Sequence, residues 1–143
     1  MKKIFAILVI SLSAVSFAKA DDRPVIFIQL PAAAQTFIND TYPDVKVSYA
    51  MVDDDLIRPD YTVVLANGVK VQFDHDGSLE KIEAREGVPA SVVPVQILDY
   101  VKMYAPDAKV VDYEVSRFGY EVQLSNRMEL NFNRNFKISR FDD

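Results

Sequence analysis

The chain has 143 residues, a single histidine, no cysteine and a formal net charge of −5 at neutral pH. The lack of cysteine excludes disulfides, and the negative charge argues against non-specific binding to nucleic acid or anionic lipid. The length is sufficient for one ordinary domain with a hydrophobic core.

The first 20 residues have the layout of a secretory signal peptide. A basic start is followed by an uncharged apolar run over 4–18 and by an A-x-A cleavage pattern at 18–20. The run is short for a membrane span, which needs about 20 residues. We therefore predict that the chain is exported, that it is cleaved before Asp21 and that it has no membrane span afterwards. The predicted location is the periplasm or the outside of the cell, with residues 21–143 forming one domain.

In the rest of the chain, the same pattern of one helix followed by several strands occurs twice. After an extended lead-in over 21–29, apolar residues at helical spacing predict a helix from Pro31 to Tyr42. A second such helix begins near Ala90 or Pro94 and ends before Pro106. Alternating apolar residues and turn signals predict strands over 45–52, 61–66, 69–73, 79–82, 111–115, 120–124, 128–132 and 136–141.

Constant spacings between equivalent residues support a duplication. Pro31 and Pro94 are 63 positions apart, whereas Asn67 and Asn126 are 59 apart. The difference of four falls in the loop over 53–60, where changes in length cost little. We predict an α+β fold, a tandem duplication of a helix plus antiparallel β-meander unit, with repeats over about 30–83 and 88–141. Up to eight strands would form one sheet with the helices on one face.

Strand alternation assigns residues to the two faces of the predicted sheet. The inward set under the helices includes Tyr49 and Met51, and Tyr100 and Tyr104 of the second helix are also expected to be buried. The outward set, on the opposite face, includes Asp112 and Glu114 together with the candidate binding residues given below. We predict that this outward face, positive in the first unit and negative in the second, binds a protein partner. The candidate binding residues are Lys46, Ser48, Thr62, Lys70, Gln72, Glu121, Gln123, Glu129 and Asn131.

Four stretches resemble the PepSY-like family of exported bacterial proteins, often called β-lactamase-inhibitor-like, and the resemblance extends over essentially all of the mature chain. They are LPAAAQTFINDTYPD, NGVKVQFDHDG, VPVQILDYVKMYAPDAKVVDYEV and GYEVQLSNRMELNFNRNFKI. These motifs mark helix ends and turns, so the resemblance implies the fold and an exported location. It also implies the architecture of a two-repeat inhibitor whose concave sheet grips its target enzyme. Leu79 departs from the aromatic residue that family members often have there. Function does not follow from the fold.

Acidic residues in two loops are the only candidates for a metal site. His75 lies between Asp74 and Asp76, but the glycine that follows comes too early for a calcium loop. The run over 53–55 with Asp60 is either a solvated acidic loop or a weak calcium site. Nucleophile motifs are absent from the sequence. We therefore predict no catalytic residues, no cofactor and no tight metal site.

Composition and motifs together indicate an exported, non-enzymatic binding module, with an inhibitor-like role as one form. The open face of the sheet is the expected surface for a protein partner. The alternative is a small-ligand-binding or enzymatic protein of the cell envelope that uses the same face or the acidic loop.

Overall fold

A computed structural model of the protein describes residues 22–54 and 58–142, so the predicted signal peptide lies outside the described residues. Two α-helices, α2 (Ala32–Thr41) and α3 (Val95–Tyr104), and one 3-10 turn, η1 (Phe27–Gln29), are present in this part of the chain. The strands are β1 (Asp22–Val25), β2 (Val47–Asp53), β3 (Asp60–Leu65), β4 (Lys70–Phe73), β5 (Leu79–Glu83), β6 (Val110–Ser116), β7 (Gly119–Leu124), β8 (Glu129–Asn133) and β9 (Ile138–Asp142).

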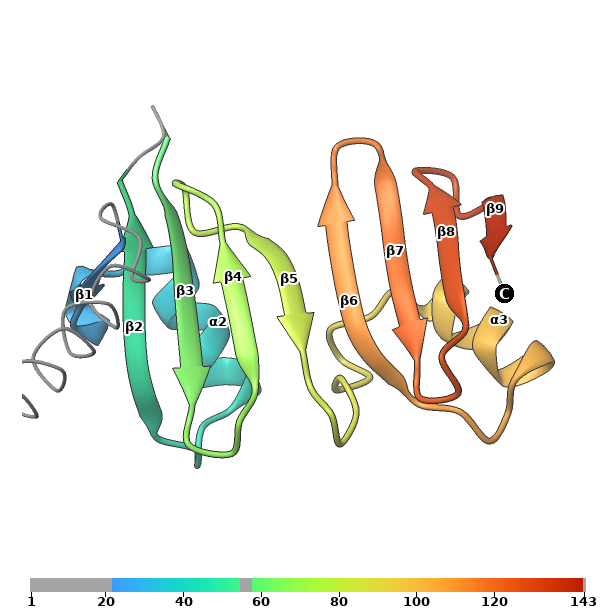
Figure 1. The fold of residues 1–143 in the computed structure, drawn as a ribbon, viewed down its shortest axis with the longest axis horizontal. Helices are drawn as coiled ribbons and strands as arrows, with labels where there is room; N and C mark the ends of the chain where they lie inside the picture. Colours follow the sequence, from blue (N-terminus) through green and yellow to red (C-terminus); the bar gives the residue numbers. More distant parts are fainter. Residues whose placement is uncertain (1–21, 55–57, 143) are drawn as a thin grey trace, which may run out of the picture.

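All strands form a single antiparallel sheet whose spatial order follows the chain order from β1 to β9. Both helices lie behind this sheet, α2 near one end and α3 near the other (Figure 1). The predicted α+β fold with repeated helix–meander units is therefore confirmed. The lead-in adds β1 at the edge, beside the eight strands of the two meanders, and Pro24 is tolerated in this edge strand.

The core lies between the helices and the inward face of the sheet. Phe73 is fully buried, and its ring meets Phe37 edge-on at a centroid distance of 5.6 Å. In the second unit Phe132 and Tyr100 repeat this contact at 5.5 Å. Phe37 and Tyr100 thus pack at equivalent places in the two units, and such pairs add to the energy of area burial.

The hairpin turns of the two units are also equivalent. Asn67 Oδ1 accepts a hydrogen bond from the Val69 N–H, and Asn126 Oδ1 accepts one from the Met128 N–H. These asparagine side chains bond their own backbone two residues on, which fixes the hairpin turns. The two units are joined by the β5–β6 pairing, which contains three residue pairs around Ile82 and Tyr113.

The predicted burial of Tyr49 and Met51 is wrong, because a β-bulge interrupts the alternation of β2. The register shifts between Val47 and Tyr49, so that the strand gains one residue relative to β3. One extra residue reverses the face of every following side chain. Ala50 and Val52 are therefore buried, and Tyr49 is 52% exposed on the other face.

The predicted burial of Tyr104 is also wrong. Its side chain is 61% exposed at the end of α3. Tyr100 occupies the place over the sheet against Phe132, and the Tyr104 ring packs on Tyr100 at a centroid distance of 4.5 Å.

Candidate functional site

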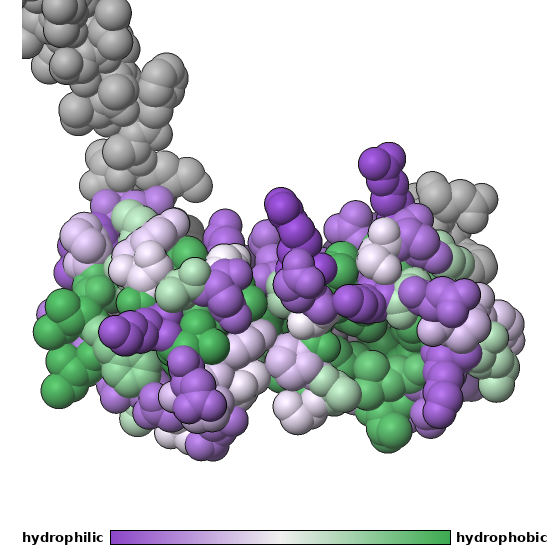
Figure 2. All heavy atoms as spheres, turned by 90° about the horizontal axis from the view of Figure 1, so that it is seen from below, coloured by the Kyte–Doolittle hydropathy of each residue, from purple (hydrophilic) through white to green (hydrophobic). Residues whose placement is uncertain are grey.

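The open face is the side of the sheet turned away from α2 and α3. Strand pairing places Thr62 beside Gln72, and Val64 beside Lys70, on this face in the first unit. It forms the upper side of Figure 2, where hydrophilic side chains project outward. In the second unit, pairing joins the open-face residues Glu121 with Asn131 and Gln123 with Glu129.

Lys46 and Ser48, the other two candidate residues, lie where β2 begins. Both are exposed. The Lys46 carbonyl accepts a hydrogen bond from the Ala66 N–H at 2.8 Å, which ties it to the end of β3. Ser48 is the extra residue of the bulge, next to Tyr49. The structure thus brings together the seven candidates of β3, β4, β7 and β8, with these two at the margin.

A hollow of about 870 Å³ lies on the open face and spans both units. Two β-bulges at equivalent places border it, since the register of β6 shifts between Val110 and Asp112 as that of β2 does near Tyr49. Bulges redirect side chains in this way beside binding sites. The lining residues are Tyr49, Val64, Gly68, Lys70, Glu83, Ala84, Arg85, Val111, Asp112, Gln123, Leu124, Ser125 and Arg127.

Sequence alternation missed several of these lining residues. Tyr49 was assigned to the core, and Arg85 and Arg127 lie outside the predicted strands. The 63-residue offset between Tyr49 and Asp112 was a signal in the sequence, because an outward residue in one unit predicts an outward residue in its copy.

Carboxylates gather on the open face of the second unit. Burial, together with the nearby Glu129 and Glu114 carboxylates, raises the pKa of Glu121, and Glu114 is directly opposite it across the strands. Burial also raises the pKa of Asp112, although Lys81 Nζ lies 3.7 Å from its Oδ2 atom and acts in the opposite direction. The negative charge of this region therefore lowers the stability of the folded protein.

We expect Glu121→Gln to stabilise the protein at neutral pH by roughly 0.2–1 kcal/mol, the range for half-exposed cross-strand charge pairs. The pKa of Glu121 is raised in the folded state, so the folded protein binds this proton more readily than the unfolded chain. Stability of the parent therefore rises as pH falls through this raised pKa, and the gain from Glu121→Gln should disappear by about pH 4. Urea unfolding at both pH values measures it, with Glu86→Gln in the linker as the control. A gain that persists unchanged at low pH would contradict this assignment.

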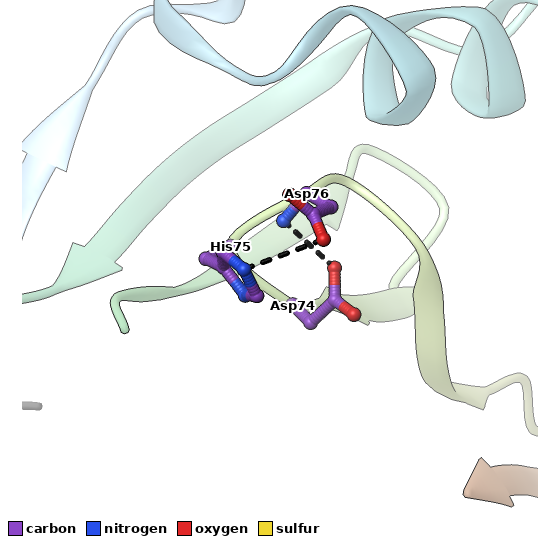
Figure 3. A group of neighbouring side chains, drawn as sticks. All are labelled: Asp74, His75 and Asp76. Atoms are coloured by element: carbon purple, nitrogen blue, oxygen red, sulfur yellow. Dashed lines mark hydrogen bonds and ion pairs between the residues drawn. The ribbon is translucent and has the colours of Figure 1, made fainter. Parts of the chain in front are cut away.

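Asp74, His75 and Asp76 form a small group in the β4–β5 turn (Figure 3). One ligand atom from each lies within 4.8 Å of the others, and His75 Nε2 is 3.3 Å from Asp76 Oδ2. Asp74 Oδ1, however, accepts hydrogen bonds from the N–H groups of Asp76 and Ser78. Asn133 makes the same two bonds in the second unit with no such group of acids. The turn accounts for this arrangement, and the expectation of no tight metal site stays a prediction.

The acidic loop between β2 and β3 is described only in part, since residues 55–57 lie outside the described residues. Asp54 forms an ion pair with Arg23 of β1. Burial and the nearby Asp53 and Asp74 raise the pKa of Asp60. Part of this acidic charge is thus already neutralised from within the chain.

A duplicated helix–meander unit, an open polar sheet face and a covered opposite face define a class of two-repeat sheet proteins. Residues 59–140 match the family model described as "Putative beta-lactamase-inhibitor-like, PepSY-like". The chain belongs to this PepSY-like family. No curated protein matches the chain.

Solved structures of Bacteroides proteins are similar to the chain, and these are three of them. One, from Bacteroides thetaiotaomicron, is described as a "putative calcium-regulated periplasmic protein", with 39% identity, a TM-score of 0.83, and coverage of 86% of this chain and 98% of its own. Another, a DUF2874-family "putative periplasmic protein" from Bacteroides vulgatus, has 38% identity, a TM-score of 0.83, and coverage of 88% and 100%. A third, also from B. vulgatus and described as of unknown function, has 30% identity, a TM-score of 0.80, and coverage of 85% and 99%.

The location of these relatives agrees with the export predicted from the sequence. All three are described as periplasmic. The protein is accordingly periplasmic or secreted. Across residues 22–54 and 58–142, neither helix has the length and apolar character needed to span a membrane.

Proposed function

We propose that the protein is an exported, non-enzymatic binding module that holds a protein partner on its open face. The hollow of about 870 Å³, lined by side chains from both units, carries this proposal. Fully buried residues, among them Val63, Phe73 and Val122, lie directly beneath this face and make it a rigid platform. Rigid surfaces bind with a smaller loss of conformational entropy.

The proposed contact residues are the nine that alternation assigns to the open face, joined by Tyr49. Protein interfaces need aromatic or arginine anchors, and Tyr49 with Arg85 and Arg127 provides them at the hollow. An inhibitor-like role, in which this face covers the site of a target enzyme, is one form of the proposal, supported by the family description.

A small ligand in the same hollow is the second candidate. Its volume lies within the range of roughly 300–1,000 Å³ that is usual for small-molecule sites. An enzymatic envelope protein that uses this hollow belongs to the same alternative. The B. thetaiotaomicron relative is described as calcium-regulated, so binding on the open face is best measured both with calcium and with a chelator.

Photo-crosslinking from both faces tests the proposal. A photoreactive residue at Thr62 or Gln123 on the open face is expected to yield one stoichiometric protein adduct in cells. The same residue at Val95 or Met103, exposed on α3, is the control and should yield none. Equal labelling from both faces, or labelling from α3 alone, would refute the proposal. A small molecule that co-purifies, detected by native mass spectrometry without any adduct, would establish the second candidate instead.

A further inference from the structure

The two units match in the core and differ at several equivalent positions of the open face. Core residues at the 63- and 59-residue offsets are of the same kind, as with Ile38 and Val101 or Phe73 and Phe132. Asp53 and Asp60 of the first unit correspond to Ser116 and Gly119, and Gln72 corresponds to Asn131. At five other pairs of open-face positions, an apolar, neutral or cationic residue of the first unit corresponds to an acidic or amide residue of the second. These pairs are Tyr49 and Asp112, Met51 and Glu114, Thr62 and Glu121, Val64 and Gln123, and Lys70 and Glu129.

The apolar half of the open face consists of Tyr49, Met51 and Val64. Tyr49 pairs directly with Val64 across β2 and β3, and Met51 follows two positions along β2. The three side chains are therefore neighbours on one face, and Tyr49 is 52% exposed. A sheet face that only meets water has polar residues at such positions. Tyr49, which is exposed beside the half-buried Met51 and Val64, therefore indicates a contact surface.

The acidic half consists of Asp112, Glu114, Glu121 and Glu129. Glu114 is directly opposite Glu121, an arrangement that destabilises a sheet when both are charged. The open-face positions of β6, β7 and β8 include no basic residue. Lys81 of the neighbouring β5 lies near Asp112 and is shared with Glu83. Cationic groups of a partner would relieve this repulsion.

The hollow joins the two halves, since Tyr49 and Val64 line it together with Asp112 and Gln123. Val64 lies on β3, and the acidic half begins three strands away on β6. At roughly 4.8 Å per strand, the two halves are about 15–20 Å apart. An extended chain covers this distance in about five or six residues, at roughly 3.3 Å per residue.

We propose that the open face binds an extended basic segment of a protein partner, lying across the strands. An apolar side chain of the segment occupies the apolar half, and Arg or Lys side chains about five residues away lie over the acidic half. This inference rests on the proposed function and specifies the chemistry of the partner. Charge complementarity also predicts association that is faster at low salt.

A defined peptide tests this chemistry without the natural partner. The probe has one tryptophan, five Gly/Ser residues and two arginines, carries a fluorophore, and is titrated with the mature protein in an anisotropy assay. We expect saturable one-to-one binding that weakens as salt rises. The double variant Glu121→Gln/Glu129→Gln should weaken it by about tenfold, and Tyr49→Ser by severalfold.

Matched controls come from the helix side and from the probe. Asp99→Asn with Met103→Ser removes one acid and one large apolar residue from the exposed surface of α3 and should leave binding unchanged. Probes with two glutamates in place of the arginines, or without the tryptophan, should bind much more weakly. Circular dichroism checks that each variant is folded.

Several results would overturn the inference. They are an absence of saturable binding, equal binding by the glutamate probe, or equal binding by the Glu121→Gln/Glu129→Gln variant. If calcium displaces the peptide from the parent protein but not from the Glu121→Gln/Glu129→Gln variant, the acidic half is a site for a divalent cation instead. If open-face crosslinks appear while the peptide fails, the partner is of different chemistry and the proposed function stands. If both fail, the open face is not the binding surface.

Discussion

Replacing Phe73 with alanine is expected to lower the free energy of unfolding by about 3–5 kcal/mol. The Phe73 side chain is fully buried under α2, where its ring also loses the edge-on contact with Phe37. The surrounding sheet positions are held by strand pairing on both sides and cannot close the cavity. Urea denaturation followed by circular dichroism measures this loss.

Two further variants test the reason for this effect. Phe132→Ala, at the equivalent place in the second unit, should cost a similar amount, since it is 3% exposed. Phe37→Ala should cost less, about 2–3 kcal/mol, because its ring is only partly buried. Phe118→Ala in the exposed β6–β7 turn is the control and should change stability by about 0.5 kcal/mol or less. Equal losses for Phe73→Ala and Phe118→Ala would contradict the assignment of the core.

The second large effect is expected from Gly119→Ala at the start of β7. An alanine Cβ there would lie 2.0 Å from the carbonyl oxygen of Phe132, and the backbone φ of +151° already disfavours a side chain. Gly119 pairs with Asn133, so the β7–β8 ladder must open to admit the methyl group. We expect a loss of about 3 kcal/mol or more from the clash and backbone strain together.

Gly68→Ala separates these two causes. Gly68 also has a positive φ, of +90°, but an added Cβ would meet no atom within 4 Å. Backbone strain alone should cost about 1 kcal/mol there. Thermal unfolding of both variants gives the comparison, and a Gly119→Ala protein as stable as Gly68→Ala would show that the strands yield easily.

Much of the fold could be predicted because the residues that start helices and form turns can be recognised in the sequence. The Pro31 and Pro94 helix starts and the Asn67-Gly68 turn each have a local physical cause, and the structure has α2, α3 and the β3–β4 hairpin at those places. The repeat then allows each unit to check the other. The lead-in, predicted as extended, forms an edge strand, whereas η1 was not predicted. In η1, Gln29 Oε1 accepts a hydrogen bond from the Ile26 N–H, and Gln35 Nε2 donates to the Ile28 and Leu30 carbonyls.

The candidate face could be predicted only in part, because a β-bulge has no residue signature. Alternation gave the correct side for Thr62, Lys70 and Glu121, which lie beyond any register shift in their strands. It failed at Tyr49, where one extra residue reverses the strand. The hollow itself depends on how several strands and turns come together, which periodicity within one strand cannot describe.

The neighbour-to-neighbour order of the sheet also affects how the protein reaches its folded state. Every strand pairs with the next one along the chain. The joint between the units consists of three residue pairs, extended by backbone hydrogen bonds from Ala84 to Val111 and from Val88 to Val110. Most contacts therefore close short loops, and chains of this kind fold quickly because little loop entropy is lost before contacts form. Each meander can thus form most of its own strand pairs independently of the other unit.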